Sequence, residues 1–282
     1  MFRLFVQLVI SSLALSSGSL FAGTQSRALD IGIVPYMSAR NLISNFEPMR
    51  HYLEKVLGKP VRIYTANGFK PFFQNAVKGD YDLVISAAHF ARLLQKEHHY
   101  TPLVMFSPGN SALVMIDAHS RLKNVQDLRG QVIAVPEQLS LASIICMTRL
   151  RDNGLRPGID YTLLEVPSFP SAILAVQKGN AAAAISASPV LASIPGDVRT
   201  SVRTLLDAGD FNSFVFLAQP RMDSAESDLL KNILLKFGQS SKEGKLFLAN
   251  TGFGNITLVT TQDMNKLDRY TTETKRLLST TP

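Results

Sequence analysis

Serine hydroxyls and backbone amides at the start of one predicted helix are the groups in this sequence best suited to bind a small anion. The segment from Val132 to Ser143 reads VIAVPEQLSLAS, an apolar strand over 132–135 followed by a helix that opens near Ser140. The first N–H groups of a helix lack backbone partners and, with the positive end of the helix dipole, attract an anion. Ser140 and Ser143 would add hydroxyl donors. Alternatively, Ser140 only caps the helix, as an isolated serine often does.

Further candidate ligand groups follow other predicted strands. Tyr36 offers a phenol hydroxyl or an aromatic face, and His89 offers an imidazole at the start of a helix. Both also have a purely structural interpretation, as a half-buried ring and as a capping or packed histidine. A serine between a strand and a helix is commonly a cap, so each serine alone is a weak signal. The predicted ligand-binding residues are Tyr36, Met37, Ser38, Ser86, His89, Ser140, Ser143, Ser168 and Ser186.

No pattern typical of a catalytic, metal or cofactor site is found. The sequence has neither a Gly-x-Ser-x-Gly elbow nor a glycine-rich phosphate loop with lysine. His98 and His99 are adjacent, so on a helix they point apart, and they have no partner at metal-ligand spacing. Cys146 is the only cysteine and follows two isoleucines, which predicts a buried, inert thiol. We therefore expect no enzyme activity, no metal and no cofactor.

The charge and the N-terminal segment limit the classes of protein to which this chain can belong. The net charge is +7 over 282 residues, and no basic run exceeds two residues, which argues against nucleic-acid binding. Residues 1–22 combine a basic start, an apolar stretch and small residues at the end, as in a signal peptide cleaved near Ala22. A retained membrane anchor is the alternative. We expect an exported, periplasmic protein.

Strands and helices alternate along the chain, which predicts α/β architecture with parallel strands. The predicted strands cover 29–34, 61–65, 83–86, 103–106, 111–116, 132–135, 162–166, 183–186, 202–206 and 214–218. The predicted helices cover 42–56, 69–78, 89–97, 124–129, 140–153, 168–178, 224–240, 242–249 and 262–279. Pro48 lies inside the first of these, so that helix either starts near Asn45 or is kinked.

An internal similarity suggests two equivalent halves. Shifting the sequence by one hundred residues places Phe69, Lys78, Gly79, Ile85, Ser86 and Ala87 on Phe169, Lys178, Gly179, Ile185, Ser186 and Ala187. Each copy reads as a helix, a glycine stop, a strand and a small-residue loop. Ligands bind at the carboxyl ends of strands in open α/β sheets, so two such halves facing each other would form a cleft.

Four segments, distributed over nearly the whole chain after the N-terminal stretch, read IGIVPYMSARNLISNFEPMRHYLEKVLGKPVRIYTA, KGDYDLVISAAHFARLL, LKNVQDLRGQVIAVPE and SSKEGKLFLANTGFGNI. In this order they resemble the phosphate/phosphonate (PhnD-like) periplasmic substrate-binding proteins of ABC transporters. The resemblance implies a two-lobed type II binding-protein fold, each lobe a mixed, mostly parallel sheet flanked by helices. It also implies that the loop after the first strand, the loop with His89 and the helix start near Ser140 contact the ligand.

Two departures from the family pattern concern the ligand. Leu139 and Leu141 lie where the family often has a turn rich in serine, threonine and glycine. The run Ala181–Ala184 replaces a strand that in the family often carries an acid. In relatives that bind aminoalkyl phosphonates, an acid can serve the ligand's ammonium, so its absence favours a simpler anion or a different ligand altogether.

These observations predict a monomeric solute-binding protein with lobe I at 28–110 plus 213–282 and lobe II at 111–212. It would capture a small oxyanion of phosphate, phosphite or phosphonate type and deliver it to an inner-membrane ABC permease. A sensory protein of the same fold, reporting its ligand to a membrane receptor, is the first alternative. An exported enzyme using the same cleft is the second, although no nucleophile–base pair can be named for it.

Overall fold

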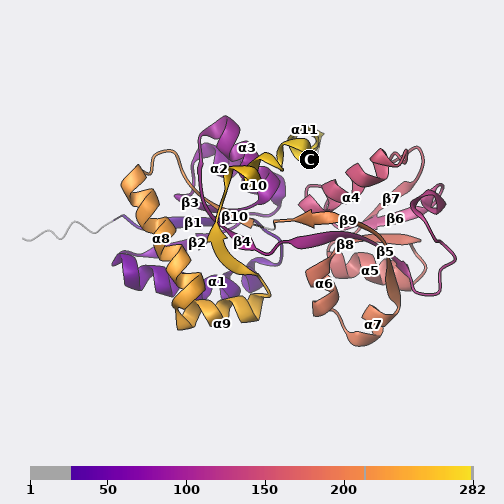
Figure 1. Cartoon of the computed structure of the whole chain (residues 1–282), viewed down its shortest axis with the longest axis horizontal. Coiled ribbons are helices and arrows are strands. Elements are labelled where there is room, and N and C mark those ends of the chain that lie inside the picture. Colours follow the sequence, from indigo (N-terminus) through magenta and orange to yellow (C-terminus); the bar gives the residue numbers. More distant parts are fainter. Residues whose placement is uncertain (1–26, 213, 281–282) are drawn as a thin grey trace, which may run out of the picture.

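Residues 27–212 and 214–280 are described by the structure, which is a computed structural model (Figure 1). The segment 1–22, predicted as a signal peptide, lies outside the described residues. Within the described ranges, none of the helices combines the length and the apolar character that crossing a bilayer requires.

One sheet is formed by strands from both ends of the described chain. Its order is β11-β4-β10-β3-β1-β2, in which β2, β1 and β3 are parallel and the other pairs antiparallel. The strands are β1 (Leu29–Ile33), β2 (Val61–Tyr64), β3 (Leu83–Ala87), β4 (Thr101–Ser107), β10 (Phe214–Ala218) and β11 (Asn255–Leu258). The helices of this part are α1 (Ala39–Leu57), α2 (Phe69–Lys78), α3 (Ala88–His98), α8 (Ser224–Ser240), α9 (Lys242–Thr251), α10 (Thr261–Asn265) and α11 (Asp268–Thr280).

The second sheet is formed by the middle of the chain. Its order is β7-β6-β8-β5-β9, with β7, β6 and β8 parallel and β5 antiparallel to both of its neighbours. The strands are β5 (Asn110–Asp117), β6 (Val132–Val135), β7 (Thr162–Glu165), β8 (Ala183–Ala187) and β9 (Val202–Phe211). The helices are the 3-10 turn η1 (Val125–Leu128), α4 (Leu141–Asp152), α5 (Phe169–Gln177), α6 (Ser188–Ser193) and α7 (Gly196–Thr200). We call each sheet with its helices a lobe.

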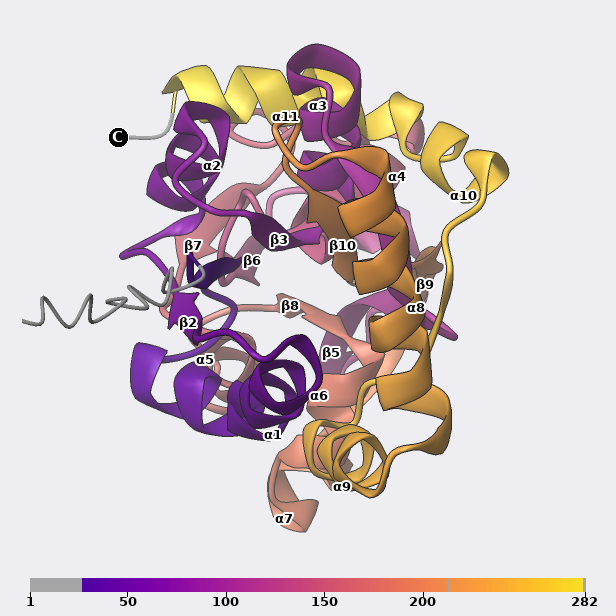
Figure 2. The same ribbon diagram turned by 90° about the vertical axis from the view of Figure 1, so that its left-hand side faces the viewer.

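Helices cover both faces of each sheet. In the first lobe α1, α8 and α9 lie on one side and α2 and α3 on the other, while in the second lobe α4 lies opposite α5, α6 and α7 (Figures 1 and 2). The central strands β3 and β8 are therefore buried along their whole length. Their sequences, LVISA and AAISA, are continuous runs of apolar and small residues, as expected for strands covered on both faces.

Most predicted elements are present, with informative differences. Helix α1 begins at Ala39 and continues through Pro48, because Leu42, Phe46, Met49 and Leu53 pack into the core on both sides of the proline. Val56, in the last turn of this helix, is 48% exposed.

Other differences concern the edges of the sheets. Strand β11 and the short helices α6 and α7 were not predicted, and the helix predicted over 262–279 is interrupted between α10 and α11. Antiparallel pairs also take a larger share than predicted, because the strands that enter each sheet from the other lobe run against their neighbours.

The chain crosses between the sheets twice, after Ser107 and after Phe211. At this point the two crossing segments touch backbone to backbone: a Cβ on Gly109 would lie 2.1 Å from the carbonyl oxygen of Phe211. Gly254 makes a similar approach, since its Cβ would lie 2.4 Å from the carbonyl oxygen of Ser107. Glycine is required at both positions for the segments to pack this closely. The lobe boundaries given above from the sequence remain a prediction.

Replacing Gly109 by alanine should therefore destabilise the protein. We expect Gly109→Ala to lower the free energy of unfolding by about 1–3 kcal/mol, because the added methyl group has no room between the crossing segments. Urea denaturation would measure the change. Gly196→Ala is the matched control, since a Cβ there meets no described atom within 4 Å. Equal stability of the two variants would contradict the proposed close contact.

Candidate functional site

The strand directions bring the carboxyl ends of both sets of parallel strands to the boundary between the lobes. Strand β4 leads directly into the crossing and, as the antiparallel neighbour of β10, runs in the same direction as β3 and β1. Strand β5 starts at the crossing, and β8 and β6 run against it, so they end there. The loops after β1, β3, β6 and β8 consequently face the same boundary (Figure 1). Every predicted site residue except Ser168 lies in one of these loops, at the end of one of these strands, or in the first turn of the helix that follows.

Tyr36, Met37 and Ser38 follow β1. The Tyr36 ring packs 4.9 Å from the ring of Phe214, at the start of β10, and its hydroxyl is buried without a hydrogen-bond partner among the described residues. Burial raises the pKa of Tyr36, an effect that the nearby Asn45 partly opposes, so the hydroxyl stays protonated and can donate. Met37 is half-buried, and its sulfur accepts from the Asn45 amide at 3.5 Å.

Ser38 is the exposed N-cap of α1, where its hydroxyl accepts from the amide of Asn41 at 3.5 Å. The Ser38 side chain therefore acts as a helix cap, as serines between a strand and a helix commonly do. The helix that it caps nevertheless begins at the lobe boundary.

Ser86 and Ser186 occupy equivalent places at the ends of β3 and β8. Both are fully buried, and neither hydroxyl has a hydrogen-bond partner among the described residues. An unpaired buried hydroxyl costs about 1–3 kcal/mol, so such groups are rare unless something outside the protein satisfies them. These two serines are the strongest indication that the boundary is a binding site.

His89 joins the lobes through a direct hydrogen bond. It lies in the first turn of α3, and its Nε2 is 2.9 Å from the carbonyl oxygen of Leu139 in the second lobe. Because a carbonyl oxygen only accepts, Nε2 carries the proton and donates. The ring is fully buried, and its Nδ1 has no partner among the described residues. Burial lowers the pKa of His89 to about 3, with the bond to Leu139 opposing, so the ring is neutral at physiological pH.

Ser140 and Ser143 form the first turn of α4, as predicted from the sequence. The Ser140 hydroxyl accepts from the Ser143 amide at 3.2 Å and donates to the Ser143 hydroxyl at 2.8 Å. Ser140 thus caps the helix, and Ser143 is fully buried beneath it. Ser140 is 6% exposed, beside the Leu139 carbonyl that meets His89, which puts the helix start at the lobe boundary and not on the outer surface.

Ser168 does not share this environment. It is exposed at the N-cap of α5, and its hydroxyl pairs with the amide and hydroxyl of Ser171 at 3.3 and 2.8 Å. The strand before it, β7, is the edge strand of its sheet. The structure therefore gives Ser168 a capping role.

Glu137 also contributes to this region, although it is not among the predicted ligand-binding residues. Its carboxylate accepts the Leu139 amide at 2.9 Å, while the carbonyl of the same Leu139 accepts from His89. Burial raises the pKa of Glu137, and the neighbouring Glu165 adds to the effect while the bond from Leu139 opposes it. Its position directly after β6, before the helix start, was the available signal.

Apolar contacts reinforce the junction that His89 and Leu139 form between the lobes. Leu139 and Ile144 of the second lobe pack with residues of β3, α3 and α11 in one buried cluster, which comprises Ala87, Phe90, Leu139, Ile144 and Leu277. Helix α11 touches both lobes: Asp268 pairs with Arg92 of α3 at 2.8 Å, and Glu273 with Arg151 of α4 at 3.2 Å. The absence of a polar turn at Leu139 thus has a structural explanation, because this leucine anchors one lobe to the other.

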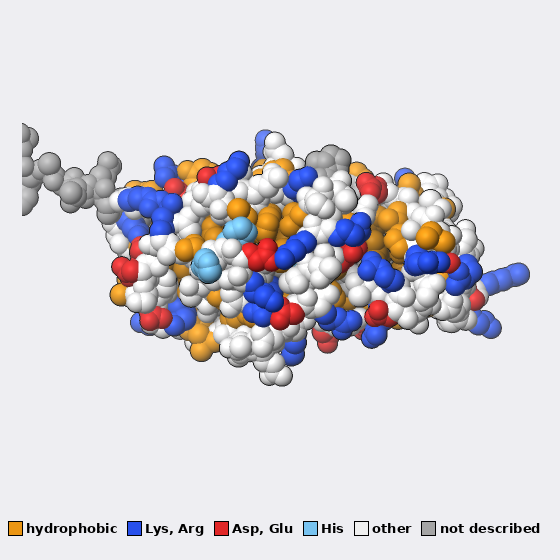
Figure 3. Space-filling view, turned by 90° about the horizontal axis from the view of Figure 1, so that it is seen from above, with side chains coloured by type: hydrophobic (Ala, Val, Ile, Leu, Met, Phe, Trp, Pro, Cys, Tyr) orange, Lys and Arg blue, Asp and Glu red, His pale blue; other side chains and the backbone are white. Residues whose placement is uncertain are grey.

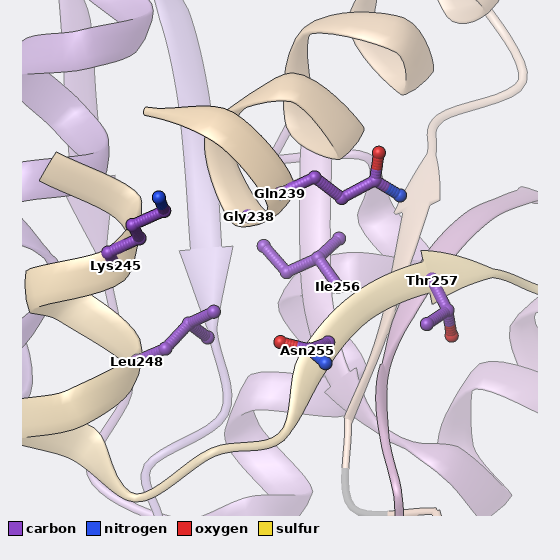
Figure 4. Close-up of a pocket in the computed structure, with 7 residues that line it drawn as sticks. All are labelled: Gly238, Gln239, Lys245, Leu248, Asn255, Ile256 and Thr257. Atoms are coloured by element: carbon purple, nitrogen blue, oxygen red, sulfur yellow. The ribbon is translucent and has the colours of Figure 1, made fainter. Parts of the chain in front are cut away.

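Cavities occur apart from the predicted site residues. One, of about 440 Å³, lies between α8, α9 and β11 and is lined by Gly238, Gln239, Lys245, Leu248, Asn255, Ile256 and Thr257 (Figure 4). Another, of about 420 Å³, lies where the crossing segments meet α10 and α11. Neither contains any of the predicted site residues. Cys146 is fully buried, as predicted, and burial raises the pKa of its thiol, which keeps it unreactive.

Two α/β lobes joined by two crossing segments, with facing strand ends, define the class of periplasmic binding proteins with the type II fold. Residues 31–264 match the family model described as "ABC transporter, phosphonate, periplasmic substrate-binding protein". The chain belongs to this family, which confirms the resemblance seen in the sequence.

Solved structures share the fold at low sequence identity. XAC2383 from Xanthomonas citri, bound to chloride ion, is 17% identical over 89% of this chain and 99% of its own, with a TM-score of 0.76. PhnD1 from Prochlorococcus marinus, in complex with methylphosphonate, is 14% identical over 89% and 98%, with a TM-score of 0.75. The aliphatic sulphonate binding protein SsuA from Escherichia coli is 17% identical over 89% and 92%, with a TM-score of 0.63.

The buried neutral His89 should make the protein sensitive to acid. A histidine whose pKa falls from 6.5 to about 3 on folding contributes stability that is complete above pH 6.5 and is lost as the pH falls towards 3. The loss amounts to at most about 1.4 kcal/mol per pH unit. We expect urea denaturation at about pH 7 and about pH 5 to show a larger decrease for the wild type than for His89→Gln. Parallel decreases would contradict the burial of a neutral imidazole.

Proposed function

We propose that this chain captures a small oxyanion of phosphate, phosphite or phosphonate type between its two lobes. The observation that carries the proposal is a set of buried polar groups at the facing strand ends, on Tyr36, Ser86, His89 and Ser186, that have no hydrogen-bond partner in the described part of the chain. Hydroxyl groups suit an oxyanion because they donate without adding an isolated buried charge.

The helices at the lobe boundary support an anionic ligand. Helices α1 and α4 both begin there, each capped by a serine, and both exceed two turns. Their first N–H groups and positive dipole ends favour negative charge. Charged side chains are interspersed with apolar ones on the face of the molecule nearest α11, with no continuous basic stripe on that face (Figure 3). An exported monomer that takes up a small anion, and not a polyanion, fits these features.

We infer that the lobes close on the ligand, that the protein releases it unchanged, and that an inner-membrane ABC permease receives it. Family membership supports this role, since the family comprises periplasmic substrate-binding proteins of ABC transporters. Export by a cleaved signal peptide at 1–22 would place the protein in the periplasm.

Ligand binding can be tested by thermal unfolding with phosphate, phosphite, methylphosphonate, aminoethylphosphonate, sulfate and sulfonates. At a hundredfold excess over Kd, a true ligand should stabilise the folded state by about 2.7 kcal/mol. We expect Ser186→Ala to weaken binding of the best ligand about tenfold, because it removes one buried hydroxyl donor. Ser168→Ala is the matched control and should leave affinity unchanged, since that serine is an exposed cap. Absence of stabilisation by every anion would refute the proposal.

A further inference from the structure

The hydrogen bond between the lobes fixes which tautomer of His89 is present. Nε2 donates its proton to the Leu139 carbonyl, 2.9 Å away, so in the neutral ring Nδ1 has no proton and bears a lone pair. The Leu139 peptide is itself held in place, because its amide donates to Glu137. The ring cannot exchange its two nitrogens without losing the contact that joins the lobes.

Nδ1 is therefore an obligate hydrogen-bond acceptor. The imidazole is fully buried and lies against the Phe90 ring, 4.3 Å between centroids. Its strongly lowered pKa means that Nδ1 does not gain a proton at physiological pH to become a donor. Nothing among the described residues donates to it.

The other unpartnered groups at the boundary are more adaptable. The hydroxyls of Ser86 and Ser186 can rotate to donate or to accept, and that of Tyr36 can also do either. Such rotatable hydroxyls do not discriminate between tetrahedral oxyanions. Among these groups, His89 alone fixes the direction of its hydrogen bond with a ligand. Its Nδ1 lone pair repels an unprotonated ligand oxygen and is satisfied by an O–H or N–H group.

We propose that His89 makes the site selective for oxyanions that carry a hydrogen-bond donor, such as the P–O–H of a phosphonate or phosphate monoanion. Fully deprotonated ions of the same shape, sulfonates and sulfate, are disfavoured. This selectivity rests on the proposed function, because it concerns the same site between the lobes. A site built to pair with a ligand hydroxyl discriminates strongly against an analogue without one, since the buried partner is left unpaired.

Methylphosphonate and methanesulfonate provide a sharp test, because at mildly acidic pH they share shape and a single negative charge and differ in one proton. We expect isothermal titration to give wild-type protein a preference for methylphosphonate of about tenfold or more. His89→Gln places an amide N–H near the position of Nε2 and leaves no acceptor at the position of Nδ1. This variant should reduce the preference to about threefold or less.

His89→Asn is the matched variant, since its side-chain oxygen lies near the position of Nδ1 and retains an acceptor there. We expect it to keep the preference for methylphosphonate, even if its affinity for both ions falls. A measurement on the wild type covers the case in which the variants do not fold: the ¹⁵N resonance of Nδ1 should shift on adding methylphosphonate and stay unchanged with methanesulfonate.

Each result has a definite meaning. Equal affinity of the wild type for the two ions, a preference unchanged in His89→Gln, or an unmoved Nδ1 resonance with bound methylphosphonate would overturn the role of His89. The proposed oxyanion-binding function would survive any of these. Failure of the wild type to bind any phosphorus or sulfur oxyanion would refute that function and the selectivity together.

Discussion

The close backbone contact between the two crossing segments is the constraint on which the rest of the structure depends. Gly109 lies against Phe211 there, and strands β4 and β10 in one lobe and β5 and β9 in the other begin or end at that point. Once these strands are fixed, pairing alone sets the direction of β3 and β8, whose carboxyl ends then face each other. The candidate site is thus a consequence of sheet connectivity, and loop sequence adjusts only its chemistry.

The chemistry at these strand ends is neutral and donor-rich. The hydroxyls of Ser86, Ser186 and Tyr36 are buried and find no hydrogen-bond partner within 27–212 and 214–280, which carries a cost in stability. Helix starts contribute partial positive charge without the desolvation penalty of a buried lysine or arginine. The apolar Leu139 then closes the boundary by packing between α3 and α4, and its peptide orients His89.

The sequence predicted the buried strands well because β3, β6 and β8 are short runs of apolar and small residues, each closely preceded by a glycine, at Gly79, Gly130 and Gly179. It missed β11, a half-exposed edge strand of four residues that lacks such a run. The start of α4 could be predicted, since an N-cap serine is a local signal, whereas the pairing of His89 with Leu139 joins residues fifty positions apart across two lobes. For the same reason, local spacing could not separate Ser168, a cap, from Ser186, whose buried hydroxyl has no partner in the part of the chain that the structure describes.

Helix α11 forms ion pairs with both lobes. Its first turn is tied to α3 through Asp268, and its middle reaches α4 through the pair of Glu273 with Arg151. If the lobes separate, α11 can remain with only one of them, so the second pair must break or slide. Since Arg151 is 43% exposed, dissolved salt screens this attraction. Ionic strength therefore affects how firmly this ion pair holds α11 to the second lobe, independently of any ligand.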